Sequence, residues 1–126
     1  MIDSQPMYSI SYHKPEKLVR LTWLAGTKGM TDQDFKEVLE AFAEAVLQHR
    51  ATRLMIDVRA FNHRPSQEVL DWRDDVTVGK YNKAGVRKLV WVWPGEVPSA
   101  QPTNADGQYQ NHYCASEQEA LAWVTA

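Results

Sequence analysis

A short run of apolar residues constrains the fold of this chain more than any other segment. Residues 53–58 read Arg-Leu-Met-Ile-Asp-Val, so large apolar side chains follow one another until Asp57. Successive side chains of a strand point to opposite faces of its sheet, and a continuous apolar run therefore needs cover on both faces. The segment predicts a central strand that is covered on both sides.

The segments around this run predict the other strands. Residues 7–12 and 17–24 alternate apolar and polar side chains, which is typical of half-buried strands. The polar turn at residues 13–16 predicts that these two strands pair as an antiparallel hairpin. Residues 86–93 are rich in β-branched and aromatic side chains and predict a further strand, and residues 109–115 predict a short last one.

The clearest amphipathic helix is predicted over residues 31–49. Thr31 is a good N-cap residue, and Asp32 and Asp34 follow in the first turn, where the helix dipole favours negative charge. Apolar residues recur at spacings of three and four, which predicts one apolar face. These residues are Phe35, Val38, Leu39, Phe42 and Val46.

A second helix is predicted from Pro65 to about Val78, followed by a polar break at residues 79–85. The residues expected along one apolar side are Val69, Trp72 and Val76. The residues expected on a solvated face are Asp71, Arg73, Asp74 and Asp75.

A short closing helix is predicted over residues 116–124, because Ser116 and Glu119 have the spacing of a capping box. The predicted order is then β-β-α-β-α-β-β-α. Strands that alternate with helices imply parallel pairing through right-handed crossovers, and the initial hairpin makes the sheet mixed. We expect a single domain over residues 1–126, with an α/β fold whose helices pack on this mixed sheet.

Composition and charge exclude several classes of protein. The chain has 126 residues, of which 44% are hydrophobic and 24% charged, as in an ordinary globular domain. Its net charge of −2 lacks the basic footprint of a nucleic-acid-binding protein. Cys114 is the only cysteine, which excludes an intramolecular disulfide and a multi-cysteine zinc site, and the four histidines lack paired ligand spacing. We expect no metal and no cofactor.

The sequence also predicts a compartment. The first residues contain no basic stretch followed by an apolar run, and the longest apolar stretches span only a few residues, as at 89–93. A membrane span needs about 20 apolar residues. We therefore expect a cytoplasmic protein without a leader peptide or a membrane span.

The order of these segments resembles a known family. Residues 54–58 (Leu-Met-Ile-Asp-Val), placed after an amphipathic helix, are similar to the central strand of STAS-type domains, the anti-sigma-factor-antagonist fold. The aromatic-rich residues 88–93 and the ending Ser-x-x-x-Ala-x-x-Trp at 116–123 are similar to the small SpoIIAA-like branch of bacterial proteins. The resemblance covers nearly the whole chain and implies a SpoIIAA-like, STAS-like fold.

The resemblance also implies a function. The best-understood members of the family are protein-binding switches, phosphorylated in an Asp-Ser-Ser-Gly-type turn after the central strand, whereas many members of this branch have no assigned activity. Here residues 59–66 read Arg-Ala-Phe-Asn-His-Arg-Pro-Ser, so the motif is absent and Ser66 is the candidate phosphorylation site. The expected function is a non-enzymatic interaction or regulatory module that binds a protein partner or itself as a homodimer.

Asp57, Arg59, His63, Arg64 and Ser66 form the candidate ligand- or partner-binding site. These residues surround the carboxyl end of the predicted central strand and the start of the next helix. Ligands of open α/β sheets bind at this end, where a helix N-terminus favours anions. The pattern predicts an anion or partner site with Arg59 and Arg64 as donors. The alternative is a turn in which Asp57 accepts backbone hydrogen bonds and the basic side chains are solvated.

Two other functions stay open. A binder of apolar or anionic small molecules would use residues 95–108 as a lid over the sheet end. An enzyme would use His63 as a base that Asp57 orients, although no nucleophile motif such as Gly-x-Ser-x-Gly is present. Trp91 and Trp93 share a strand face, which favours core positions, and the alternative is an aromatic patch for a ligand or a dimer partner.

Overall fold

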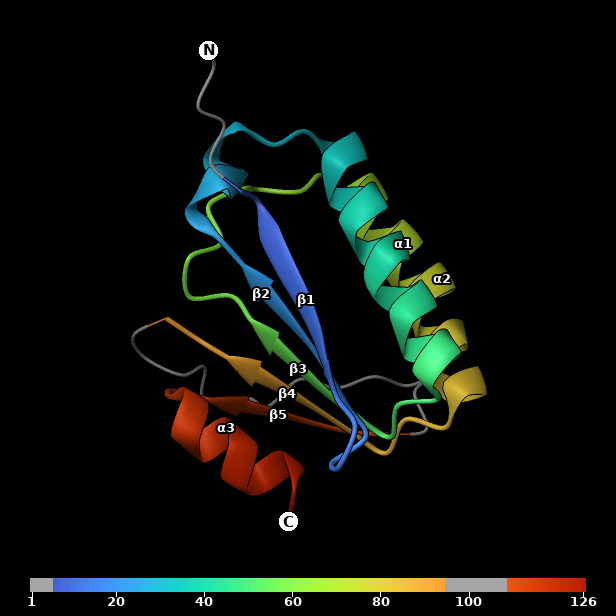
Figure 1. The fold of residues 1–126 in the computed structure, drawn as a ribbon. Coiled ribbons are helices and arrows are strands. Elements are labelled where there is room, and N and C mark those ends of the chain that lie inside the picture. Colours follow the sequence, from blue (N-terminus) through green and yellow to red (C-terminus); the bar gives the residue numbers. More distant parts are fainter. Residues whose placement is uncertain (1–5, 95–108) are drawn as a thin grey trace.

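The computed structural model describes residues 6–94 and 109–126. These residues form strands and helices in the predicted order, with one added 3-10 helix (Figure 1). The strands are β1 (Tyr8–His13), β2 (Leu18–Trp23), β3 (Arg53–Asp57), β4 (Lys88–Val92) and β5 (Gln110–Cys114). The helices are the 3-10 helix η1 (Ala25–Gly29), α1 (Asp32–His49), α2 (Gln67–Ala84) and α3 (Glu117–Val124).

The five strands form one mixed sheet in the order β1-β2-β3-β4-β5. β1 and β2 pair antiparallel, as the hairpin prediction requires, and each strand from β2 to β5 runs parallel to the next. β3 lies in the centre, and Leu54 to Asp57 are all buried, as the apolar run predicts. The general α/β class with a mixed sheet is confirmed.

Helices cover both faces of the sheet (Figure 1). α1 and α2 lie side by side over one face, and α3 lies on the other face against β3, β4 and β5. The larger core is on the α1 side, where Phe42, Leu21 and Leu54 are fully buried. A smaller core lies under α3. Its residues are Leu18, Met55, Val90, Val92, Cys114, Ala120 and Val124.

The structure of α1 agrees with its sequence pattern. Thr31 and Asp34 form a capping box, in which Thr31 Oγ1 accepts from the Asp34 N–H (3.1 Å) and the Asp34 carboxylate accepts from the Thr31 N–H (3.0 Å). This box satisfies two of the N–H groups that a helix start leaves without intrahelical partners. All five residues of the predicted apolar face are buried.

The predicted extent of the second helix is wrong. Ser66 caps α2, and the helix continues through residues 79–84, where the sequence predicts a polar break. Gly79 costs only about 1 kcal/mol inside a helix relative to alanine, and burial of Tyr81 in the next turn offsets this cost. Gly85, with φ of 93°, ends the helix in the left-handed conformation that favours glycine.

The predicted apolar side of this helix is also wrong in part. Val69 is buried, and half-buried Trp72 packs against the larger core, whereas Val76 is only half-buried. The other buried residues of α2 are Thr77, Val78 and Tyr81. The helix therefore turns a mixed polar and apolar side toward the sheet.

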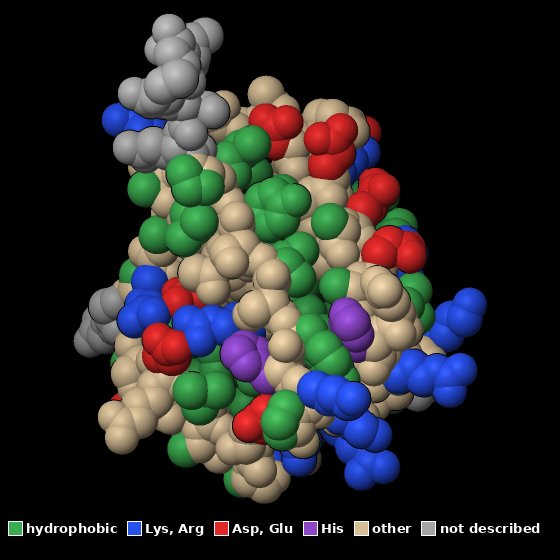
Figure 2. Space-filling model, in the orientation of Figure 1, with side chains coloured by type: hydrophobic (Ala, Val, Ile, Leu, Met, Phe, Trp, Pro, Cys, Tyr) green, Lys and Arg blue, Asp and Glu red, His purple; other side chains and the backbone are tan. Residues whose placement is uncertain are grey.

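The charged side chains are unevenly spread over the face seen in Figure 2. Lys and Arg side chains gather at the lower right, at the end of the molecule where α1 and α2 finish, and Asp and Glu side chains gather toward the other end of these helices. Within the described residues, none of the helices combines the length and the apolar character that a membrane crossing requires.

Candidate ligand-binding site

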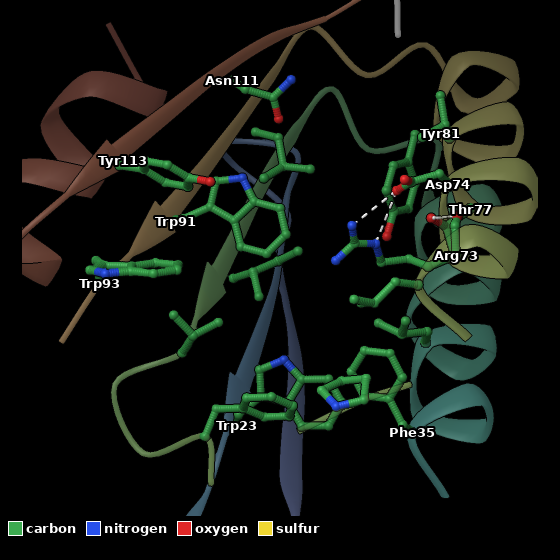
Figure 3. A pocket seen from close by; sticks show the side chains of 18 of the residues that line it. Trp23, Phe35, Arg73, Asp74, Thr77, Tyr81, Trp91, Trp93, Asn111 and Tyr113 are labelled. Atoms are coloured by element: carbon green, nitrogen blue, oxygen red, sulfur yellow. Dashed lines mark hydrogen bonds and ion pairs between the residues drawn. The ribbon is translucent and has the colours of Figure 1, made fainter. Parts of the chain in front are cut away.

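A pocket of about 730 Å³ lies between the sheet and α2. Figure 3 shows side chains that project into it from the helix on one side and from the strands on the other. Small-molecule sites commonly enclose about 300–1,000 Å³. The pocket is therefore large enough for a drug-sized molecule.

A row of paired residues builds the sheet wall of the pocket. Ile56 of β3 lies opposite Trp91 of β4, and Trp91 lies opposite Tyr113 of β5. Paired residues point to the same face of a sheet, so the row faces α2. The Tyr113 ring lies 6.5 Å from the Trp91 ring and 5.0 Å from the Trp93 ring. Trp91 and Trp93 are only half-buried, and they present aromatic surface to the pocket.

One side of α2 builds the opposite wall. Its lining residues recur at helical spacing: Leu70, Arg73, Asp74, Thr77, Val78 and Tyr81. Residues three and four positions apart share one side of a helix. This side mixes apolar residues with charged and hydroxyl side chains, which is the composition expected of a ligand site rather than of a closed core.

Three aromatic residues close one end of the pocket. Trp23, at the end of β2, stacks on Phe35 of α1 with ring centroids 5.5 Å apart. Phe61, from the loop between β3 and α2, lies 4.8 Å from Trp23 and 5.9 Å from Phe35. The position of this loop therefore helps to set the shape of the pocket.

A buried threonine fixes the loop that carries Phe61. Thr27 of η1 is fully buried, and its hydroxyl donates to the Leu24 carbonyl (2.9 Å). The same oxygen accepts from the Asn62 N–H (2.7 Å). Thr27 thus ties the loop after β3 to the turn after β2.

Replacing Thr27 with valine is expected to lower the free energy of unfolding by about 1–3 kcal/mol, because the Asn62 N–H loses its buried acceptor. Chemical denaturation measures the change. Thr52→Val is the control, because half-buried Thr52 makes no side-chain hydrogen bond to any residue that the structure describes, and its expected effect is within about 0.5 kcal/mol. Equal effects of the two substitutions would contradict the role given to Thr27.

Polar groups gather on the α2 wall. The Arg73 guanidinium donates from Nε and Nη2 to Asp74 Oδ1, at 3.1 and 3.0 Å. The Thr77 hydroxyl donates to the Arg73 carbonyl (2.6 Å). Burial raises the pKa of Tyr81 far above its usual value, so its hydroxyl stays protonated at any ordinary pH. Figure 3 shows Arg73 extending from α2 toward the sheet wall.

The sheet wall contributes one polar atom without a partner. The indole nitrogen of Trp91 is buried and has no hydrogen-bond acceptor among the described residues. A buried donor left unsatisfied costs about 1–3 kcal/mol, and native structures contain few of them. Such a group beside a pocket is consistent with an acceptor that arrives with a ligand.

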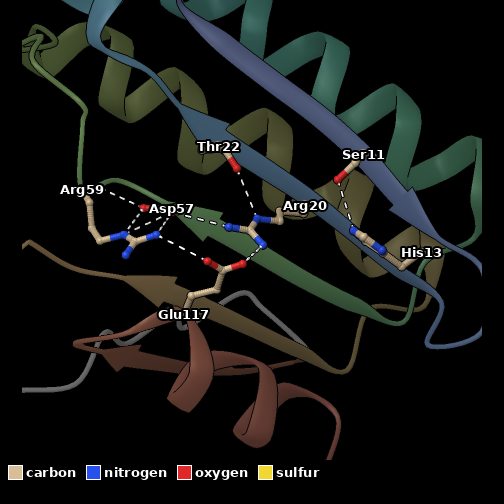
Figure 4. A network of polar contacts seen from close by, with 7 residues as sticks. All are labelled: Ser11, His13, Arg20, Thr22, Asp57, Arg59 and Glu117. Atoms are coloured by element: carbon tan, nitrogen blue, oxygen red, sulfur yellow. Dashed lines mark hydrogen bonds and ion pairs between the residues drawn. The ribbon is translucent and has the colours of Figure 1, made fainter.

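Two of the residues predicted from the sequence lie on the opposite face of the sheet. Asp57 accepts hydrogen bonds from Arg59 Nε (3.0 Å) and Nη2 (2.7 Å), and Arg20 Nη2 lies 3.6 Å from the same carboxylate (Figure 4). Glu117, at the start of α3, accepts from Arg20 and lies 3.7 Å from Arg59. The guanidinium of Arg59 is thus paired with two carboxylates, which opposes its predicted use as an anion donor.

The electrostatics of this network fit its geometry. Burial by itself raises the pKa of Asp57, but hydrogen bonds from Arg59 and the charges of Arg59 and Arg20 outweigh this and lower it. The pKa of Glu117 is lowered mainly by its hydrogen bond from Arg20. Both carboxylates are therefore ionised at neutral pH, and the network ties the start of α3 to β2 and β3.

The remaining predicted residues lie on the other side of the loop. His63 Nε2 lies 3.0 Å from Asp32 Oδ1, so His63 pairs with Asp32 and not with Asp57 as the enzyme alternative requires. Ser66 accepts from the Val69 N–H as the N-cap of α2, and hydrogen bonds from Ser66 and His63 lower the pKa of Asp32. A phosphate on Ser66 would meet this carboxylate. Arg64 is exposed.

The sequence prediction therefore groups residues that the structure separates. Asp57 and Arg59 belong to the α3 face, whereas His63 and Ser66 meet at Asp32 beside the starts of α1 and α2. The predicted lid at residues 95–108 lies outside the described residues. The pocket residues that the prediction missed are Arg73, Thr77, Tyr81, Asn111 and Tyr113. The available signal was the spacing of two between Asn111 and Tyr113 in the predicted last strand, which places both on one face of that strand.

Neither a metal site nor a known relative identifies the function of the pocket. In the part of the chain that the structure describes, no three His, Cys, Asp or Glu side chains are grouped so that they would hold a metal ion. No protein-family model matches the chain, and no significant match was found among curated proteins or solved structures. The geometry of the pocket therefore carries the functional argument.

Proposed function

We propose that the protein binds a small, largely apolar molecule in the pocket between α2 and the sheet. The observation that carries this proposal is the space of about 730 Å³ itself. Helices of layered α/β folds pack directly on their sheet, and protein interiors leave few voids larger than a water molecule. A space of this size, lined by aromatic side chains and a few polar groups, is typical of a ligand site.

The other functional predictions stay predictions. A STAS-like interaction module, a homodimer, a cytoplasmic location and the lack of enzymatic activity are all compatible with a ligand pocket. The pocket favours small-molecule binding among these alternatives because it lies apart from the Asp57–Arg59 pair, whose groups already satisfy one another.

The proposal predicts that N-phenyl-1-naphthylamine, a neutral aromatic dye that fluoresces in apolar surroundings, binds the protein at one site. Leu70→Trp should weaken this binding more than tenfold, because Leu70 lines the pocket and the larger indole would occupy its space. Fluorescence titration measures the dissociation constant. Near-ultraviolet circular dichroism shows whether the variant is folded, and Val58→Phe fills the pocket from the sheet side if it is not.

The matched control is Leu121→Trp. Leu121 is an exposed leucine on α3, on the opposite face of the sheet, so the same substitution there should leave dye binding within about twofold of wild type. Absence of dye binding to the wild-type protein, or equal losses in the two variants, would overturn the proposal.

A further inference from the structure

Two donor side chains of the pocket, Arg73 and Trp91, have room for a further acceptor. Arg73 is the one cationic side chain among the described residues that line it, and Trp91 adds a buried N–H without an acceptor. The Arg73 fork donates from Nε and Nη2 to a single oxygen of Asp74. A ligand that brings acceptors or negative charge could bond to the Trp91 N–H and to the Arg73 guanidinium.

The partner of Arg73 can be exchanged. The side chain of Asp74 is 63% exposed, whereas that of Arg73 is 35% exposed. An ion pair this close to solvent holds its partners weakly. The Asp74 side chain can therefore rotate away from Arg73 and remain hydrated. An incoming carboxylate or sulfonate would present two oxygens to the guanidinium, which is the geometry that arginine binds best.

The apolar walls favour a flat, aromatic body. Trp91, Trp93 and Tyr113 form one aromatic surface on the sheet side, and Tyr81 lies across the pocket on α2 (Figure 3). Aromatic rings stack on such surfaces or contact them edge-on. These contacts contribute more binding free energy than the buried area alone would. Arg73 would repel a cationic ligand, although aromatic surroundings by themselves suit cations.

We propose that the ligand is an aromatic monoanion, a carboxylate or sulfonate on an aromatic body, whose anionic group replaces Asp74 on Arg73. This inference rests on the proposed function and specifies the class of molecule that the pocket takes. The aromatic body lies against the sheet wall, and the anionic group reaches the α2 wall.

A pair of dyes isolates the anionic group. 8-Anilinonaphthalene-1-sulfonate and N-phenyl-1-naphthylamine share the anilinonaphthalene skeleton, and only the first carries a sulfonate. Arg73→Gln should weaken binding of the sulfonate dye at least tenfold more than binding of the neutral dye. Asp74→Asn should strengthen binding of the sulfonate dye severalfold, because it removes the competing carboxylate.

Arg87→Gln is the control, because Arg87 is an exposed arginine that does not line the pocket, and both dyes should bind this variant as they bind wild type. Arg73→Lys, which keeps the charge but loses the fork, replaces Arg73→Gln if that variant does not fold. Equal losses for both dyes, or no loss for either, would overturn the inference. The proposed function would still stand if the neutral dye binds the wild-type protein and Leu70→Trp weakens that binding. Failure of the neutral dye to bind would overturn the proposed function instead.

Discussion

Replacing Asp57 with asparagine is expected to lower the free energy of unfolding by about 3 kcal/mol at neutral pH. The Asp57 side chain is only 5% exposed, and its carboxylate accepts hydrogen bonds from the Arg59 side chain and from the Arg59 N–H (3.0 Å). The amide has one acceptor oxygen and no charge, so it would leave Arg20 and Arg59 without their buried counter-ion. Urea denaturation followed by circular dichroism measures the change.

The same carboxylate makes this difference depend on pH. The pKa of Asp57 is lowered in the folded protein, so ionised Asp57 stabilises the fold above the unfolded pKa of about 4. This contribution is lost as the pH falls through the lower folded pKa. The stability difference between wild type and Asp57→Asn should therefore be full at pH 7 and shrink progressively below about pH 4.

Glu117→Gln is the control that distinguishes the effect of the buried Asp57 carboxylate from that of an exposed one. The Glu117 side chain is 42% exposed, and an ion pair of this kind contributes less than about 1 kcal/mol. Both substitutions remove one negative charge from the same network, so a difference in net charge does not distinguish them. Equal losses of stability, or a loss for Asp57→Asn that is the same at pH 3 and pH 7, would contradict the role given to Asp57.

The elements that the sequence predicted best are those whose packing is regular. α1 buries a full apolar face against the sheet, so its three- and four-residue spacing is visible in the sequence, and Thr31 marks its start. β3 is covered on both faces, and its continuous apolar run shows this directly. In these segments the apolar residues mark the faces that another layer of the fold covers.

α2 was predicted least well because one of its sides faces the pocket. Arg73, Asp74 and Thr77 occupy positions that would be apolar if the helix packed directly on β4 and β5. The apolar spacing is therefore interrupted in the sequence. Gly79, which lies inside the helix, has the character of a residue that ends one. The mismatch between pattern and structure supports the proposed ligand site, since sequence rules fail most often where function requires polar groups in place of core.

The residues of the predicted candidate site do not lie together, because successive residues of a strand point to alternate faces of the sheet. Sequence proximity placed Asp57 and His63 together, but Asp57 points to the α3 face of β3, whereas the loop beyond it returns to the α1 side, where His63 meets Asp32. The pocket instead draws Ile56, Trp91 and Tyr113 from three strands. Their proximity depends on strand register, which a single sequence does not specify.

Replacing Phe42 with alanine is expected to lower the free energy of unfolding by about 3–5 kcal/mol. Phe42 of α1 is fully buried, and its ring meets the Tyr81 ring of α2 edge to face at 5.9 Å. Tyr81 in turn lines the pocket. The cavity left by the substitution would give Tyr81 space to move, so binding of N-phenyl-1-naphthylamine should weaken along with stability.

Met55→Ala is the matched control for this effect. Met55 is also fully buried, but it belongs to the smaller core under α3, and its truncation should cost about 2–5 kcal/mol. Because the sheet separates that core from the pocket, dye binding by the folded fraction should stay within about twofold of wild type. Titration below the melting temperature of both variants tests this. If Met55→Ala weakened dye binding as much as Phe42→Ala, binding would follow overall stability, and the contact between Phe42 and Tyr81 would have no specific part in shaping the pocket.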